Sequence, residues 1–284
     1  MPDMPARMLF GPGPSDVASS VLEAMSRPIV GHLDPAFVEL LDDVARMLRE
    51  TFRTANEVTF AVSGTGSAGM EMALVNLLEP GDRAIVCVAG VFGERLAEIA
   101  RRCGAQVDEV RAEWGSPVPE AAVREALARG PAKVVALVHA ETSTGMHQPV
   151  EQIARDAREH GALVVLDAVT SLAGIPLSVD EWGVDVCYSG TQKCLSVPPG
   201  LSPITFSPRA MEAAGARREP VRSWYLDVTL ITRYWGADRV YHHTAPISML
   251  YALHEGLRIV LAEGLEARWE RHDRLGTKLQ ASLV

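Results

Sequence analysis

The stretch Val184-Asp-Val-Cys-Tyr-Ser-Gly-Thr-Gln-Lys193 joins an apolar, β-prone run to a lysine that closes it. A second run of this kind, Leu163-Val-Val-Leu-Asp167, ends in an aspartate. Because the carboxyl ends of parallel strands meet at one edge of a sheet, we expect Asp167 and Lys193 to converge there. The pair therefore predicts a parallel sheet with a chemically active edge.

A lysine and an aspartate in this arrangement are the pair that pyridoxal phosphate (PLP) requires. The lysine forms a Schiff base with the cofactor aldehyde, and a carboxylate keeps the pyridinium nitrogen protonated so that the ring can act as an electron sink. A lone lysine is usually a solvated surface charge. Two further features favour the cofactor interpretation for Lys193.

The first feature is the glycine-rich turn Ser63-Gly-Thr-Gly-Ser-Ala-Gly69, which follows a strand-like run and leads into a segment of helical composition. Glycines let the backbone approach an anion, and the free N–H groups of a helix start point at it. The same glycines match a dinucleotide fingerprint, which needs an acidic residue at the end of the next strand. Residues 84–89 offer none. The turn therefore predicts a phosphate site of another kind.

The second feature is Asp167-Ala-Val169, where alternate residues of an extended segment share a face. If Asp167 reaches the nitrogen of a ring, Val169 can lie against one face of that ring. Phe92, between Gly90 and Gly93, is the candidate for the other face. A single phenylalanine is more often a core residue, but its flanking glycines favour a loop.

Strand-like and helix-like segments alternate along the first 208 residues. This alternation predicts an α/β fold, with a mostly parallel seven-stranded sheet and helices on both faces. Thr142, Asp167 and Lys193 then fall at carboxyl ends of strands. Beyond Pro208 the pattern stops, and two long helices are expected, the second with a solvated charged face. The expected helices are 16–27, 35–52, 67–78, 94–103, 119–128, 150–160, 248–261 and 265–284, and the expected strands are 58–62, 84–88, 107–110, 133–139, 163–167, 184–188 and 203–206.

Composition excludes several classes of function. The chain has 284 residues, 48% of them hydrophobic and 22% charged, which is typical of a globular protein with a large core. Its net charge of −9 argues against nucleic-acid binding. No apolar stretch approaches the ~18 residues of a membrane span, and the N-terminus lacks the apolar core of a signal peptide. Four cysteines without a C-x-x-C motif indicate reduced thiols and a cytoplasmic protein.

Two histidine motifs are candidates for a metal site. His139-Ala-Glu141 is similar to the H-x-E of zinc deaminases, but the partner P-C-x-x-C motif is absent. His242 and His243 are adjacent, so we expect them to point in different directions, and no third ligand is evident. The sequence therefore predicts no metal site.

The chain resembles a class V aminotransferase of the alanine–glyoxylate / serine–pyruvate type, within the fold-type I PLP enzymes, along almost its whole length. The matching segments are Phe10-Gly-Pro-Gly-Pro-Ser15, Ser63-Gly-Thr-Gly66, Ala73-Leu-Val-Asn-Leu-Leu-Glu-Pro-Gly-Asp82, Glu141-Thr-Ser-Thr-Gly145, Asp167-Ala-Val169, Tyr188-Ser-Gly-Thr-Gln-Lys193, Pro198-Pro-Gly200 and Tyr241-His-His-Thr-Ala-Pro246.

This resemblance implies a role for each residue of the site. Lys193 would carry the cofactor and then act as general acid–base in the 1,3-proton shift, while Asp167 would pair with the ring nitrogen. Phe92, where the family often has tryptophan, and Val169 would sandwich the ring. The other implied contacts are Thr142 on the ring hydroxyl, Thr65, Gly66, Ser67 and Gln192 on the phosphate, Tyr241 and Thr244 on the phosphate from the partner chain, and Gly31 beside the substrate.

The resemblance also implies a domain plan and a homodimer with shared active sites. Residues 1–30 would form an N-terminal arm that crosses to the neighbouring subunit, and residues 31–262 the PLP-binding large domain. Residues 263–284 would begin a helix that leads to a C-terminal small domain, which supplies an arginine for the substrate carboxylate. Since the sequence stops at residue 284, we expect this chain to lack that domain, to bind PLP and to handle amino acids poorly.

The implied reaction moves an amino group from L-alanine or L-serine to glyoxylate or a similar small 2-oxo acid. A ureidoglycine–glyoxylate aminotransferase is a close alternative that the sequence does not exclude, and the sequence does not choose the donor and acceptor. A lyase or cysteine desulfurase on the same fold would want a histidine over the ring and a mobile catalytic cysteine. An inactive truncated chain is the alternative that is not an enzyme.

Overall fold

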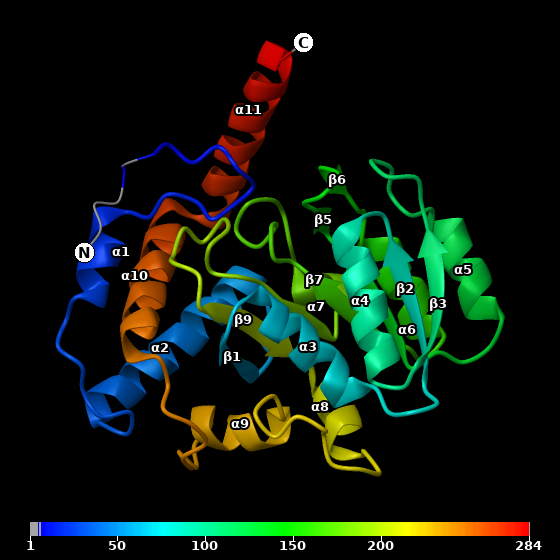
Figure 1. Ribbon diagram of the computed structural model, residues 1–284, viewed down its shortest axis with the longest axis horizontal. Coiled ribbons are helices and arrows are strands. Elements are labelled where there is room, and N and C mark those ends of the chain that lie inside the picture. Colours follow the sequence, from blue (N-terminus) through cyan, green and yellow to red (C-terminus); the bar gives the residue numbers. More distant parts are fainter. Residues whose placement is uncertain (1–4, 6, 284) are drawn as a thin grey trace.

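The computed structural model describes residues 5 and 7–283 of the chain, which form a central sheet between layers of helices (Figure 1). The seven strands lie in the order β1-β9-β8-β7-β4-β2-β3. Strand β9 runs antiparallel to both of its neighbours, and all other pairs from β8 to β3 are parallel. The predicted α/β class with a mostly parallel seven-stranded sheet is therefore confirmed. The strands of this sheet are β1 (Val58–Ser63), β2 (Arg83–Val88), β3 (Gln106–Arg111), β4 (Val134–Val138), β7 (Leu163–Asp167), β8 (Val186–Tyr188) and β9 (Leu201–Phe206).

Helices surround this sheet and continue beyond its last strand. They are α1 (Ser19–Met25), α2 (Pro35–Phe52), α3 (Gly66–Leu77), α4 (Val91–Arg102), α5 (Glu120–Ala128), α6 (Glu151–Glu159), α7 (Val179–Trp182), α8 (Pro208–Gly215), α9 (Val228–Trp235), α10 (Ile247–Glu263) and α11 (Leu265–Leu283). None of the described helices is long and apolar enough to cross a membrane.

The central strands are buried because helices cover both faces. In β2, Ile85 and Cys87 join the core on the side of α2, α5, α6 and α10, whereas Val86 and Val88 join the core under α3, α4 and α8. Successive side chains of a strand point to opposite faces, so one apolar run fills two cores. All residues of β4 and β7 are buried. The unbroken apolar runs of the sequence are explained by this double cover.

Local signals fix some helix ends and not others. Helix α2 spans the predicted 35–52, because the Asp34 side chain accepts the N–H of Ala36 and Pro35 opens the first turn. Helix α4 begins at Val91, three residues before the predicted start. Phe92 therefore lies in the first turn of a helix and not in a loop.

The sequence reasoning missed several elements. Helices α7, α8 and α9 were not expected, nor was the short antiparallel pair β5 (Ala140–Glu141) and β6 (Met146–His147). In α11, Arg268 is only 6% exposed, although the charged residues there were expected on a solvated face. The start of the predicted N-terminal arm, residues 1–4 and 6, and residue 284 lie outside the described residues.

Candidate active site

The carboxyl ends of β7 and β8 bring Asp167 and Tyr188 side by side in register. Asp167 is 2% exposed; its Oδ1 accepts the N–H of Val169 at 2.9 Å, and its Oδ2 accepts the Tyr188 hydroxyl at 2.7 Å. Burial raises the pKa of Asp167 to about 6, although these two hydrogen bonds oppose the rise. A dry carboxylate of this kind favours a cationic partner.

Lys193 lies in the loop that follows β8. Its Nζ donates to the carbonyl oxygen of Pro12 at 2.8 Å, so a turn near the N-terminus covers the amine. Partial burial lowers the pKa of Lys193, which increases the fraction of neutral, nucleophilic amine. The described part of the arm thus contacts the lysine of its own chain.

Three of the predicted segments meet beside this loop. A Cβ added at Gly66 would lie 3.1 Å from Val169 Cγ2, and one added at Gly190 would lie 3.5 Å from Val169 Cγ1 and 3.0 Å from Gln192 Oε1. The start of α3, the segment after β7 and the loop after β8 are therefore in contact. Of the predicted site residues, the structure brings together Gly66, Val169 and Gln192.

The start of α3 offers free donors. Thr65 occupies the N-cap with extended backbone, and no side chain caps the helix. Thr65 and Ser67 are both exposed. The Oε1 atom of Gln192 is buried without a hydrogen-bond partner among the described residues. Uncapped N–H groups at a helix start and hydroxyls suit an anion, to which an amide can donate only through its NH2 group.

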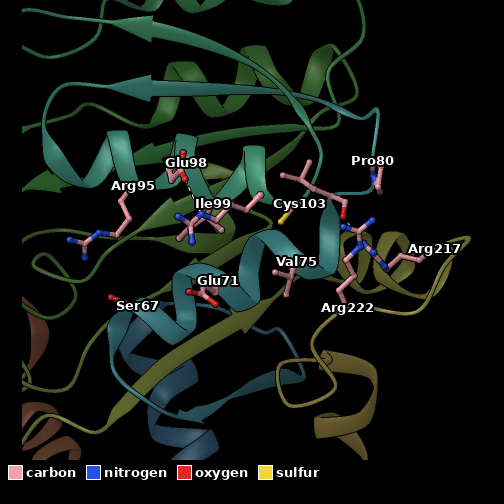
Figure 2. A pocket seen from close by; sticks show the side chains of 12 residues that line it. Ser67, Glu71, Val75, Pro80, Arg95, Glu98, Ile99, Cys103, Arg217 and Arg222 are labelled. Carbon is pink, nitrogen blue, oxygen red and sulfur yellow. Dashed lines mark hydrogen bonds and ion pairs between the residues drawn. The ribbon is translucent and has the colours of Figure 1, made fainter.

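A cavity of about 410 Å³ begins near this helix start and runs between α3 and α4 (Figure 2). Ser67 and Arg95 line it toward one end, and Arg217 and Arg222 toward the other. The residues that line it do not include Asp167 or Lys193. The cavity is therefore a neighbour of the carboxyl edge and does not contain its reactive groups.

Phe92 is positioned by a buried carboxylate. Glu141, 1% exposed, accepts the N–H groups of Phe92 and Gly93, each at 3.2 Å from Oε2, and the Ser143 hydroxyl at 2.6 Å. The negative charge at the positive end of α4 fixes the first turn of the helix. The guanidinium carbon of Arg95 lies 5.0 Å from the centre of the Phe92 ring.

Thr142 lies beside the segment that follows β7. Its hydroxyl donates to Thr170 Oγ1 at 3.3 Å, and Thr170 in turn donates to the carbonyl of Ala140 at 2.7 Å. The sequence reasoning did not assign the roles of Glu141 and Tyr188, although both stand in the quoted motifs. The signals available were a phenolic residue that ends a buried strand, Tyr188, and a carboxylic acid three residues beyond another, Glu141.

Tyr241 and Thr244 lie together beside His32, the residue that follows Gly31. Tyr241 is 55% exposed, its hydroxyl lies 3.4 Å from Thr244 Oγ1, and its ring centre lies 5.0 Å from that of His32. Among the described residues, no hydrogen bond joins Tyr241 or Thr244 to residues 65–67. The nearby His243 reaches the glycine-rich turn, with Nε2 2.7 Å from Ser63 Oγ.

The histidine motifs form pairs. His139 and His147 face each other with 3.1 Å between their Nε2 atoms. His242 and His243 also meet, with 2.8 Å between their Nδ1 atoms, so the expectation that they point apart was wrong. They lie in irregular chain between α9 and α10, where adjacent side chains need not diverge. Within residues 5 and 7–283, no group of three or more potential metal ligands is present.

A profile of the family described as aminotransferase class-V matches residues 9–284. The chain belongs to the class V aminotransferases. The predicted family and the predicted cofactor are confirmed, and this class V aminotransferase is a PLP-dependent enzyme.

Relatives match nearly the whole chain. This class V aminotransferase is 41% identical over 298 residues to the (S)-ureidoglycine–glyoxylate transaminase of Bacillus subtilis, covering 98% of the chain and 71% of that protein. It is 39% identical over 282 residues to the alanine–glyoxylate aminotransferase of Oryctolagus cuniculus, covering 98% and 72%. The crystal structure of an alanine–glyoxylate aminotransferase from Nostoc sp. superposes with a TM-score of 0.96 at 49% identity, covering 98% of this chain and 74% of that one.

The carboxyl edge of this class V aminotransferase fits PLP. The dry carboxyl of Asp167 suits a protonated pyridine nitrogen, and the uncapped start of α3 with the exposed residues Thr65 and Ser67 suits a phosphate. Partial burial lowers the pKa of Lys193, whose amine is carried by the loop after β8. Acidic, basic and anion-binding groups are thus present in the combination that the cofactor needs.

Proposed function

We propose that this enzyme moves an amino group from L-alanine or L-serine to glyoxylate or a similar small 2-oxo acid. The two alanine–glyoxylate aminotransferases, at 39% and 49% identity, support this choice. The single structural observation that carries the proposal is the buried carboxyl of Asp167 at the end of β7, beside the strand that leads into the loop of Lys193. It accepts two hydrogen bonds, but no salt bridge joins it to a cation among the described residues. The Bacillus subtilis relative favours a second donor, ureidoglycine, with the same acceptor.

The proposed roles assign the chemistry to two residues. PLP supplies an electron sink when bound. Lys193 would hold the cofactor covalently, and its amine, once released by the amino substrate, would act as the general acid–base of the 1,3-proton shift. Asp167 holds a proton on the ring nitrogen. Phe92 and Val169 would lie against the two ring faces, and Thr142 would bind the ring hydroxyl.

The proposed phosphate site is completed by a second chain. Thr65, Gly66, Ser67 and Gln192 hold the phosphate, and Tyr241 and Thr244 join them from the partner of a homodimer. The exposure of Tyr241 and Thr244 supports this arrangement, because both side chains are free to meet another subunit. Gly31 would lie by the substrate; the next residue, His32, has its ring centre 5.0 Å from that of Tyr241.

The proposed domain plan keeps residues 1–30 as an arm, 31–262 as the cofactor-binding unit and 263–284 as the start of a further helix. Gly264, with φ of +84°, separates α10 from α11 and supports the second boundary. We also propose a cytoplasmic location, which the four free cysteines support.

The chain contains only three lysines, Lys133, Lys193 and Lys278, so cofactor attachment can be located cleanly. Borohydride reduction of the PLP-treated protein and peptide mapping should place the label on Lys193, and the Lys193→Ala variant should take none. Lys133→Ala is the matched control and should label as wild type does. Label on Lys133 or Lys278 alone would disprove the assignment.

The substrate proposal is tested by a screen of amino donors against glyoxylate and pyruvate. L-Alanine or L-serine with glyoxylate should give the highest kcat/KM. A higher value for ureidoglycine would move the enzyme to the second candidate. Activity regained on mixing Lys193→Ala chains with chains that carry Tyr241→Phe and Thr244→Ala would support shared sites in a dimer, and no regain would argue for self-contained sites.

A further inference from the structure

The loop that carries Lys193 is held by two distant parts of the chain. The Ser15 hydroxyl donates to the carbonyl oxygen of Lys193 at 2.9 Å, and the Arg268 guanidinium donates through Nη2 to the carbonyl oxygen of Cys194. Two consecutive carbonyls of the loop are therefore bound, the first by a residue of the arm and the second by a residue of α11. We call Ser15 and Arg268 the loop anchors.

Burying Arg268 at this position carries a large desolvation penalty. It is 6% exposed, and a buried guanidinium is costly unless its charge is paired and its donors are used. Glu263 Oε2 pairs with Nη1 at 2.7 Å, and the Cys194 carbonyl uses Nη2, but Nε has no partner among the described residues. An apolar side chain of similar volume often stabilises a fold as well as a buried ion pair does. Stability alone therefore does not explain the charge, and the hydrogen bond to Cys194 indicates a second role for it.

The partner of Arg268 is itself fixed. Arg271 donates to Glu263 from Nε at 2.5 Å and from Nη2 at 2.9 Å. These bonds, and then those from Arg268, lower the pKa of Glu263 to about 2. Glu263 therefore stays charged near neutral pH and holds the Arg268 fork in one orientation. Arg271 shares the carboxylate, and within the described part of the chain it forms no hydrogen bond to the lysine loop.

Ser15 acts on the other side of the loop. Its backbone N–H donates to the Gln192 carbonyl at 2.9 Å, while its hydroxyl reaches Lys193. Just before it, Gly13 lies so close to the lysine that an added Cβ would be 2.6 Å from Lys193 Cδ and 2.7 Å from Nζ. The arm therefore restrains both the backbone and the side chain of Lys193.

We propose that Arg268 and Ser15 are positioning residues that set where the Lys193 amine meets the cofactor. A lysine side chain is long and flexible, so its amine is placed only as well as its backbone is held. A loop outside the sheet opens readily unless hydrogen bonds restrain it. The inference rests on the proposed role of Lys193 and deepens it.

The test is the rate at which the cofactor-free chain captures PLP covalently, followed by absorbance. Arg268→Met should slow capture by about ten- to a hundredfold, because a misplacement near 1 Å has that order of effect. Ser15→Ala should slow it by a smaller factor of about three to ten, since one neutral hydrogen bond is lost. Arg268→Lys, which keeps a donor and the charge, should recover part of the rate.

A second measurement separates positioning from general loosening. The pH at which the absorbance of the lysine-linked cofactor changes should shift in Arg268→Met and Ser15→Ala. Arg271→Met is the matched control for α11, because it also removes hydrogen bonds to Glu263 but removes none to the loop. Ser26→Ala is the control for the loss of a hydroxyl in the N-terminal region. Both controls should keep the wild-type rate and pH profile.

Each outcome decides. Equal slowing in Arg268→Met and Arg271→Met would show that the Glu263 ion pair matters and the Cys194 contact does not, which overturns the proposal. Wild-type rates and pH profiles in the anchor variants would overturn it while leaving Lys193 as the cofactor lysine. Failure of the wild-type chain to link PLP at Lys193 would instead remove the proposed function. If Arg268→Met does not fold, Arg268→Lys and Ser15→Ala carry the same test.

Discussion

Replacing Asp167 by asparagine removes a buried charge whose effect on stability follows from the structure. Burial raises the pKa of this carboxyl from 3.8 to about 6. Each pH unit between these values is worth about 1.4 kcal/mol. In the cofactor-free chain, the ionised carboxyl therefore lowers the free energy of unfolding by about 3 kcal/mol above about pH 6.

The direction of the pH dependence follows from proton binding. The folded chain holds the Asp167 proton more tightly than the unfolded chain does, so unfolding between about pH 4 and about pH 6 releases a proton. The Asp167 contribution to stability is therefore present below this window and is lost as the pH rises through it. Asp167→Asn has no such proton. Between about pH 4.5 and about pH 7.5, the wild type should lose about 2 kcal/mol relative to the variant.

Urea unfolding of the cofactor-free wild type and Asp167→Asn across this pH range measures the difference. Asp273→Asn, at an exposed position of α11, is the control and should follow the wild type. A stability difference between wild type and variant that stays constant with pH would refute the argument that the buried, ionised carboxyl of Asp167 destabilises the folded chain. In the PLP-loaded enzyme, the variant should lose the chemical step more than cofactor retention, because a neutral amide cannot hold the ring nitrogen protonated.

Three further variants test the packing around the site. Gly69→Ala should lower the free energy of unfolding by about 1–3 kcal/mol, because the new Cβ would lie 2.1 Å from Ser202 Oγ; Gly276→Ala, with nothing within 4 Å, is the control in urea unfolding. Glu141→Gln should lower the free energy of unfolding by about 1 kcal/mol, and hydrogen exchange should show that the first turn of α4 opens more readily. Phe92→Ala should weaken PLP retention by about five- to tenfold through lost stacking, whereas Phe92→Trp should keep it in the same dialysis assay.

The fold was predictable where one short segment contains all the information. The runs 163–167 and 35–52 were predicted with the observed ends, because a two-sided core demands an unbroken apolar strand and because Asp34 and Pro35 start a helix locally. Helix α9 also had a local signal, since the Asp227 side chain accepts the N–H of Thr229, but the reasoning did not use it.

Other features depend on residues far apart in the sequence. Helix α4 starts early because Glu141, 49 residues from Phe92, occupies its N-terminus. Arg268 is buried because a carbonyl 74 residues away accepts its hydrogen bond, and helical periodicity alone assigns such a charge to solvent. The candidate site was predictable as a set of motifs, but the carboxylate that fixes Phe92 and the anchors of the lysine loop were not.

The two loop anchors also set an order of events during synthesis. Ser15 is 178 residues from Lys193, and Arg268 is 74 residues beyond Cys194, so the loop acquires its final shape only after the chain has been made past residue 268. Contacts of such long range form late, because the intervening chain must first close. The nascent protein can therefore build most of its sheet while the loop of Lys193 is still unanchored, and rapid attachment of PLP would mark a chain whose Ser15 segment and α11 have already docked.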